Sequence, residues 1–144
     1  MPPVTSARSP AADGCELCAA REETFRVVKT TIHSFAIVCR WPLKEGHLLV
    51  LPRRHALDLA ELDSQESKDL LSLVSEMKTL LRAKYGDAVV ALNTGAHASQ
   101  PHLHFHVCPS PAAFRDLLAR YEDIPVRPDV DDATLGAMRD RLLF

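Results

Sequence analysis

Hydrophobic and polar positions along the chain predict a series of short strands. Two runs rich in β-branched and apolar residues, 24–29 and 34–39, are typical of neighbouring strands. The nearly continuous apolar run 47–51 indicates a third strand, and the run 88–92 indicates a buried fourth one. A last strand is expected over 102–108, because the prolines that closely follow it break an extended segment.

The clearest helical pattern runs over 64–85. Four apolar side chains recur there at helical spacing: Leu70, Val74, Met77 and Leu81. Asp63 and Glu66 resemble a capping box at the start of this helix, and Gly86 is a suitable residue to end it. One face of the helix should therefore pack against a core.

The two ends of the chain differ in character. The first 13 residues are rich in Pro, Ala and Ser and predict a flexible tail, so the folded domain is expected over 14–144. Shorter helices are expected at 112–121 and 133–142. Strands, one long helix, more strands and final helices in this order favour an α+β fold with an antiparallel sheet.

Composition narrows the class of protein. The chain has 144 residues, of which 47% are hydrophobic and 25% charged, as expected of one globular domain. The net charge of -2 gives no basic field, so duplex nucleic acid is not an expected partner. No apolar run approaches the ~20 residues of a membrane span. Without a secretory pattern at the N-terminus we expect a cytoplasmic protein, with its four cysteines reduced.

Three alternating histidines are the most informative stretch. His102, His104 and His106 would share one face of the last predicted strand, because successive strand side chains point to opposite sides. Such a face is a solvent-facing polar stripe, a catalytic metal site or a site for a reactive imidazole. The strand carries no carboxylate beside the histidines, which disfavours the catalytic metal.

At these histidines the chain resembles a known family. The run 99–109 looks like the signature of histidine-triad (HIT) proteins, in which three histidines alternate with apolar residues. Residues 46–55 resemble a second block of that family, and 95–101 resemble the branch containing dinucleoside polyphosphate hydrolases and phosphorylases. The resemblance covers about 15–109. It implies a HIT-like fold, with an antiparallel sheet of about five strands, one long helix and short C-terminal helices.

The resemblance also implies a chemistry. The middle histidine of the family attacks the α-phosphorus of a nucleotide; that position is His104, and His106 would donate to the phosphate oxygens. Imidazole is a good nucleophile when its other nitrogen is held by an acceptor such as a backbone carbonyl. Three further residues are expected at the nucleotide: Asn93, Ser99 and Gln100. The expected reaction cleaves a nucleoside 5′-phosphoryl bond, in a dinucleoside polyphosphate or a nucleoside phosphoramidate, through a covalent nucleotidyl-histidine.

Cys15 and Cys18 form a Cys-x-x-Cys pair, and two thiolates at this spacing can bind one tetrahedral zinc ion. A redox pair and two plain buried cysteines are the alternatives, although a redox pair requires a βαβ context that the pattern lacks. Some HIT proteins complete such a site with two histidines, which by position are His55 and His102. The resemblance therefore implies a structural zinc.

Several positions depart from the family pattern or allow two interpretations. Many HIT proteins have an Asp or Asn, which meets the ribose hydroxyls, at the position of Cys39, a weak hydrogen-bond partner. Ile37 and Trp41 lie beside it and are candidates for a base pocket. His47 is either a reserve zinc ligand or a partner of the triad. Asn93 fits equally well as a turn residue at a strand end.

Three hypotheses about function stay open at this point. The first is an enzyme that uses His104 as its nucleophile on a small nucleotide. The second is a non-catalytic, zinc-stabilised module that binds nucleotides. The third is a metal-dependent hydrolase with the triad as ligands. A homodimer is expected by family analogy alone.

Overall fold

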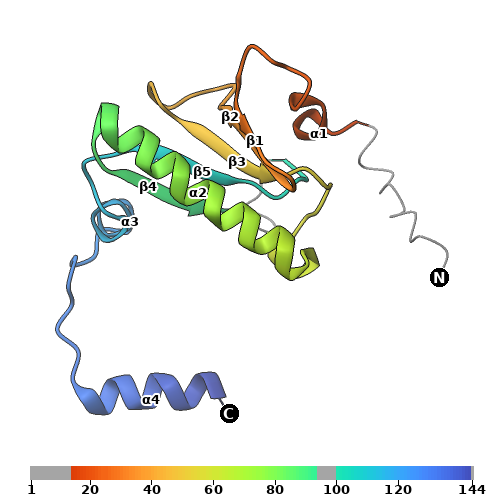
Figure 1. Cartoon of the computed structure of the whole chain (residues 1–144). Coiled ribbons are helices and arrows are strands. Elements are labelled where there is room, and N and C mark those ends of the chain that lie inside the picture. Colours follow the sequence, from red (N-terminus) through yellow and green to blue (C-terminus); the bar gives the residue numbers. More distant parts are fainter. Residues whose placement is uncertain (1–13, 94–99, 144) are drawn as a thin grey trace, which may run out of the picture. The chain divides into compact units, whose positions relative to one another are not determined.

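The computed structural model describes residues 14–93 and 100–143 of the chain (Figure 1). The tail expected at 1–13 and the phosphate contact expected of Ser99 lie outside the described residues. The chain divides into two compact units, one ending at Pro111 and the other beginning at Ala112.

A five-stranded sheet forms the centre of the first unit. Its strands are β1 (Val27–Thr30), β2 (Ser34–Val38), β3 (Leu48–Pro52), β4 (Ala88–Leu92) and β5 (Phe105–Pro109). They lie in the order β1-β2-β3-β5-β4, and every neighbouring pair is antiparallel. The predicted α+β class and antiparallel sheet are confirmed. The last strand begins at Phe105 and not at residue 102, a difference that matters for the histidines.

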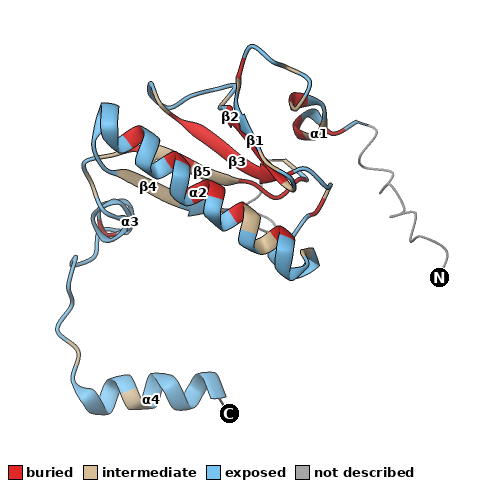
Figure 2. Cartoon of the chain, viewed as in Figure 1, coloured by how far each residue is buried: buried red, intermediate tan, exposed pale blue. Residues whose placement is uncertain are grey.

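The long helix α2 (Ser64–Tyr85) covers one face of the sheet (Figure 1). Its capping box is present: Asp63 accepts from the Glu66 N–H, and the Glu66 carboxylate accepts from the Asp63 N–H. The four residues of the predicted apolar stripe are all buried: Leu70, Val74, Met77 and Leu81. Figure 2 shows buried positions on the side of α2 that faces the strands. The helix therefore supplies half of the main core.

A short helix, α1 (Glu16–Ala20), packs with the other face of the sheet and was not predicted. Its buried Leu17 and Ala20 join a second core with Phe35, Ile37, Leu49 and Leu51. The strand register places Val27 opposite Ile37, Ile37 opposite Leu49, and Leu49 opposite His106. Side chains opposite one another share a face. His106 therefore points to the face that carries α1, away from α2.

The second unit holds α3 (Phe114–Glu122) and α4 (Asp132–Leu143), close to the two predicted C-terminal helices. Helix α3 ends at Asp123, which adopts a left-handed conformation with φ of 53°.

A 3-10 turn, Leu59–Glu61, precedes α2 in the first unit. Among the described residues, no helix combines the length and the apolar character that crossing a bilayer demands.

Candidate functional site

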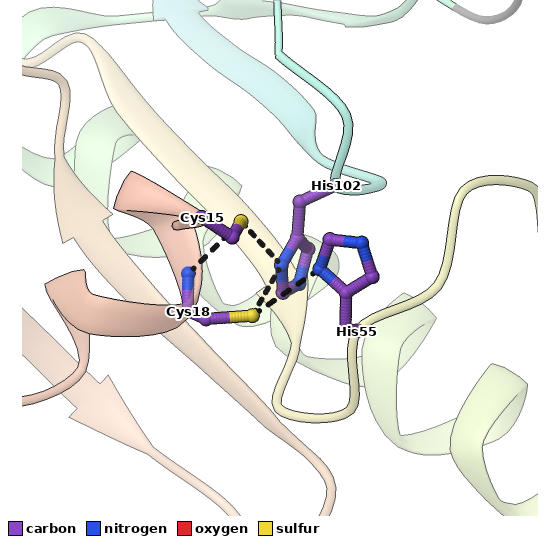
Figure 3. A group of neighbouring side chains, drawn as sticks. All are labelled: Cys15, Cys18, His55 and His102. Atoms are coloured by element: carbon purple, nitrogen blue, oxygen red, sulfur yellow. Dashed lines mark hydrogen bonds between the residues drawn. The ribbon is translucent and has the colours of Figure 1, made fainter. Parts of the chain in front are cut away.

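Four side chains converge between α1 and the ends of two loops (Figure 3). Cys15, Cys18, His55 and His102 each offer one ligand atom, and these atoms lie within 4.8 Å of one another. The Nδ1 atom of His102 is 3.5 Å from the Cys15 sulfur and 3.3 Å from the Cys18 sulfur. The Nδ1 atom of His55 is 3.3 Å from the Cys18 sulfur. The sequence prediction of this residue set is thus matched by proximity in the fold.

The donor set fits a tetrahedral zinc ion. Zn–S and Zn–N bonds of about 2.3 and 2.0 Å place sulfur and nitrogen ligands roughly 3.5 Å apart, close to the distances found here. His102 donates its Nε2–H to the Pro52 carbonyl at 2.8 Å, which leaves Nδ1 with a lone pair facing the sulfurs. The Nε2 atom of His55 is buried without a hydrogen-bond partner within the described residues. This cluster could therefore hold a metal.

Burial shifts the pKa of two side chains of this cluster. Burial, with the neighbouring Cys15, raises the pKa of the Cys18 thiol to about 11. Burial also lowers the pKa of His102 to about 4, so its imidazole is neutral near pH 7. A bound cation reverses this preference at the sulfurs, because a coordinating thiol loses its proton outright. Arg21 lowers the pKa of Cys18 only partly, so a metal ion would supply the positive charge that favours the thiolate.

Two interactions hold the segment that carries His55. Arg54 donates to both carboxylate oxygens of the buried Glu66, at 3.0 and 2.8 Å. The N–H of Leu103 donates to the Ala56 carbonyl at 2.7 Å, which ties this segment to the one that carries His102. The N-terminus of α2 and the approach to β5 therefore position the histidine half of the cluster.

The predicted arrangement of the three histidines on one strand is wrong in one respect. Only His106 lies within β5, whereas His102 and His104 precede the strand. His102 is 1% exposed, and its ring faces the two cysteines and His55. Strict alternation fails here because metal-type contacts and the Leu103 backbone bond replace strand pairing at residue 102. The apolar residues that alternate with the histidines pack under α2, where Leu103 and Val107 are buried and Phe105 is partly buried.

His104 is held by its own backbone neighbour. Its Nδ1 atom lies 2.7 Å from the carbonyl oxygen of His102, so Nδ1–H donates to that oxygen. A neutral imidazole with its proton on Nδ1 has a lone pair on Nε2. His104 is 3% exposed and lines a cleft of about 560 Å³. This is the tautomer that a nucleophilic imidazole requires.

Two consecutive hydrogen bonds, through His47, fix the tautomer of His106. The backbone N–H of Leu43 donates to Nδ1 of His47 at 3.1 Å, so the proton of a neutral His47 is on Nε2. That Nε2–H donates to Nδ1 of His106 at 2.9 Å. Burial lowers the pKa of both rings, that of His106 to about 4, and favours the neutral forms. His106 therefore carries its proton on Nε2 and is a hydrogen-bond donor.

The cleft in front of these rings lies on the face of the sheet that carries α1. The described residues that line it are Glu16, Leu17, Ala19, Glu23, Arg26, Cys39, Arg40, Trp41, Leu49, Gln100, His104 and His106. Cys39, at the position that the family uses for the ribose, and Trp41, a candidate for the base pocket, both line the cleft, and their roles stay predictions. Ile37 does not, because its side chain is fully buried in the core beneath α1.

Gln100 and Asn93, two residues predicted to contact the nucleotide, lie in different places relative to the cleft. Gln100 lines the cleft, and its amide donates to the Glu16 carboxylate at 3.4 Å. Asn93 follows β4 and is exposed, and it is not among the described residues that line the cleft. The roles expected of both stay predictions.

Sequence patterns missed a polar group in the cleft wall. Glu23 contacts both Arg26 and Arg40, at 3.2 and 2.8 Å. All three side chains line the cleft. Charged residues just before a strand normally indicate an exposed surface, so nothing in their spacing marked them. Of the two roles open for His47, its hydrogen bond to His106 favours the partner of the triad.

The fold and the site together define an α+β protein with a histidine-lined cleft beside a Cys2His2 cluster. The HIT domain family model matches residues 20–112, and the chain belongs to the HIT family. The chain is 28% identical over 99 residues to an adenosine 5′-monophosphoramidase of Schizosaccharomyces pombe, covering 69% of this chain and 74% of that protein.

Two further comparisons extend the picture. A bis(5′-adenosyl)-triphosphatase of Saccharomyces cerevisiae is 32% identical over 91 residues, covering 60% of this chain and 44% of that protein. The crystal structure of a HIT family member from Bacillus subtilis matches with a TM-score of 0.67 at 17% identity, covering 90% of this chain and 94% of that one. The latter comparison shows the shared fold.

Proposed function

We propose that this chain is a nucleotide hydrolase or transferase that cleaves a nucleoside 5′-phosphoryl bond through a covalent nucleotidyl-histidine at His104. The observation that carries the proposal is the hydrogen bond from His104 Nδ1–H to the His102 carbonyl. It leaves the Nε2 lone pair available in a cleft large enough for a small ligand.

The reaction has two displacement steps at one phosphorus atom. His104 Nε2 forms a bond to the α-phosphorus, while the bond from that phosphorus to the leaving amine or phosphate breaks; a leaving amine takes a proton from solvent, and a leaving phosphate departs as the anion. Water or another acceptor then attacks the same phosphorus, loses a proton to solvent, and the bond from phosphorus to His104 Nε2 breaks. Developing charge on the phosphoryl oxygens is stabilised by donors, among which His106 Nε2–H and the Gln100 amide are our candidates.

The names of two relatives support a substrate class for this proposal. One acts on an adenosine phosphoramidate and another on a bis-adenosyl triphosphate, as their names state. Both kinds of molecule present an α-phosphorus with a leaving group to a nucleophile. We propose the same two classes here, with the dinucleoside polyphosphate branch favoured by residues 95–101.

The metal has a structural role in this proposal. Cys15, Cys18, His55 and His102 would fill all four positions of a zinc ion and leave none open for substrate. His102 already belongs to this cluster, and His106 accepts at Nδ1 and so carries its proton on Nε2, which argues against a metal held by the triad. A homodimer remains part of the proposal by family analogy.

Trapping the intermediate tests the proposal. The full chain is mixed with a labelled adenosine phosphoramidate or diadenosine triphosphate, quenched rapidly in alkali, and analysed by peptide mass spectrometry. We expect one nucleotidyl group on residue 104, no adduct in His104→Ala, and a normal adduct in His33→Ala, a matched change in the β1–β2 turn. Nucleotide binding without adduct or turnover would instead favour a non-catalytic binding module.

A further inference from the structure

A buried arginine side chain lies in the wall of the cleft. Arg26 is 9% exposed, and it lines the same cleft as His104. Its Nη1 atom is enclosed and has no partner within the described residues, and its Nε atom faces the Glu23 carboxylate without forming a hydrogen bond to it. The nearby Glu23 carboxylate lies 3.2 Å from Nε and balances the charge, but it also accepts from Arg40 at 2.8 Å. Buried donors without acceptors are costly, so a ligand acceptor is the natural partner for this guanidinium.

The strand order places Arg26 far from the reactive histidine along the cleft. Arg26 directly precedes β1, and the aligned row of Val27, Ile37, Leu49 and His106 runs from that strand across to β5. Three strand spacings separate β1 from β5, about 14 Å at roughly 4.8 Å each. A nucleotide with its phosphorus at His104 and its body over Leu49 would therefore present its base toward Arg26.

The position of Trp41 also indicates that the base would lie at this end of the cleft. Trp41 follows β2, the neighbour of β1, and lines the cleft with its side chain 70% exposed. An exposed indole face is a stacking surface for a nucleobase, which every base can use. Stacking on Trp41 would set the ring plane, and Arg26 would then meet an edge of the base.

The chemistry of the guanidinium selects the base. Arginine carries only donors, so it favours an edge that shows only acceptors. Guanine and hypoxanthine present O6 and N7 together, whereas adenine presents an amino donor beside N7. We propose, on the basis of the proposed function, that Arg26 makes this site selective for 6-oxopurine nucleotides over adenine nucleotides. Glu23 acts as a positioning residue that orients the guanidinium.

Binding of nucleoside 5′-monophosphates to the full chain tests this specificity. Calorimetric titrations compare GMP, IMP, AMP and 7-deaza-GMP, which lacks the N7 acceptor. We expect GMP and IMP to bind with similar affinity, about tenfold more tightly than AMP, and 7-deaza-GMP to lose most of that advantage. Arg26→Met keeps the length of the side chain and removes its donors, so it should abolish the preference while AMP affinity changes less than about twofold. Arg82→Gln, on the exposed side of α2, should preserve the preference.

The outcomes separate this inference from the proposed function. Equal or tighter binding of AMP by the wild type would overturn the specificity while leaving the enzyme proposal intact. A uniform loss for all four ligands in Arg26→Met would also overturn it, because Arg26 would then contact a part common to them. If Arg26→Met fails to fold by circular dichroism, the ligand series on the wild type decides alone. Failure to bind any nucleotide would refute both.

Discussion

Nε2 of His47 lies 2.9 Å from Nδ1 of His106, and this contact links a backbone amide to the histidine-lined cleft. The Leu43 N–H fixes the proton of His47 on Nε2, and His47 in turn fixes the proton of His106 on its outer nitrogen. A residue 59 positions away in sequence thus decides whether His106 donates or accepts. Orientation by such a partner is a common requirement of functional imidazoles.

Replacement of His47 should impair turnover more than binding. His47→Phe leaves Nδ1 of His106 without its donor, so we expect kcat to fall about 100-fold and KM to change less than about threefold. His47→Gln offers an amide N–H at a similar place and should recover part of the rate. Steady-state kinetics of the three proteins measure both effects. Equal rates for the Phe and Gln variants would contradict the positioning role.

Removal of one cluster ligand should release the metal and lower stability. The full chain should contain about one zinc per molecule, and Cys18→Ser should contain almost none. Losing several kcal/mol of metal-linked stability should lower Tm by about 10 °C, and a strong chelator should do the same to the wild type. Cys108→Ser is the matched control, because Cys108 lies in β5 outside the cluster, and should keep its zinc. A Cys18→Ser protein with full zinc content would refute the assignment.

Acid should destabilise the fold through His106. Its pKa is about 4 in the folded chain, mainly because of burial, and about 6.5 when unfolded. Between these values the unfolded chain binds a proton that the folded chain does not, so the free energy of unfolding falls as pH drops from about 6.5 toward 4. His106→Asn keeps an acceptor for His47. Between pH 6.5 and 4, its free energy of unfolding should fall by roughly 2 kcal/mol less than that of the wild type.

Urea unfolding at pH 7 and at pH 4.5 measures this difference. His102 has a similarly lowered pKa but is present in both proteins, so its contribution cancels in the comparison. Parallel pH profiles for the two proteins would show that His106 titrates normally in the folded state.

Gly46 should tolerate no side chain. Its φ is +90°, and a Cβ there would lie 2.9 Å from Cγ of Pro109 and 3.0 Å from the ring of Tyr85. Gly86 has nearly the same φ, +88°, but an added Cβ would meet nothing within 4 Å. Gly86→Ala should therefore cost only the backbone strain, about 1–3 kcal/mol, and Gly46→Ala should cost more. Equal losses in chemical denaturation would show that the steric contact is relieved at no cost.

Much of the fold could be predicted because its signals are local. The stripe on α2, its capping box and the run 88–92 depend on neighbours in sequence, and the structure has them at the predicted residues. The short helix α1 was missed because five residues are too few to show a helical period. The start of β5 was placed too early because the alternation at His102 looks like a strand, although its ring is held by cysteines distant in sequence.

Only part of the site could be predicted from the sequence, because only part of it consists of local motifs. The histidines and the Cys-x-x-Cys pair form patterns that can be recognised, and the cluster of His55 and His102 with the two cysteines appears in the structure. The wall formed by Glu23, Arg26 and Arg40 has no such pattern. Its place in the cleft depends on the pairing of β1 with β2, which brings Arg26 beside the end of β2 through the bond from the Val38 N–H to the Arg26 carbonyl.

His102 serves two neighbours with different parts of one residue. Its ring faces the thiols of α1, and its main-chain oxygen holds the imidazole of His104. One residue thus contributes both a proposed metal ligand and the carbonyl that orients the proposed nucleophile, so a movement of residue 102 on metal loss would also shift the acceptor of His104. For anyone seeking an inert version of this protein that still folds, residue 104 is the position to change and residue 102 the one to leave alone.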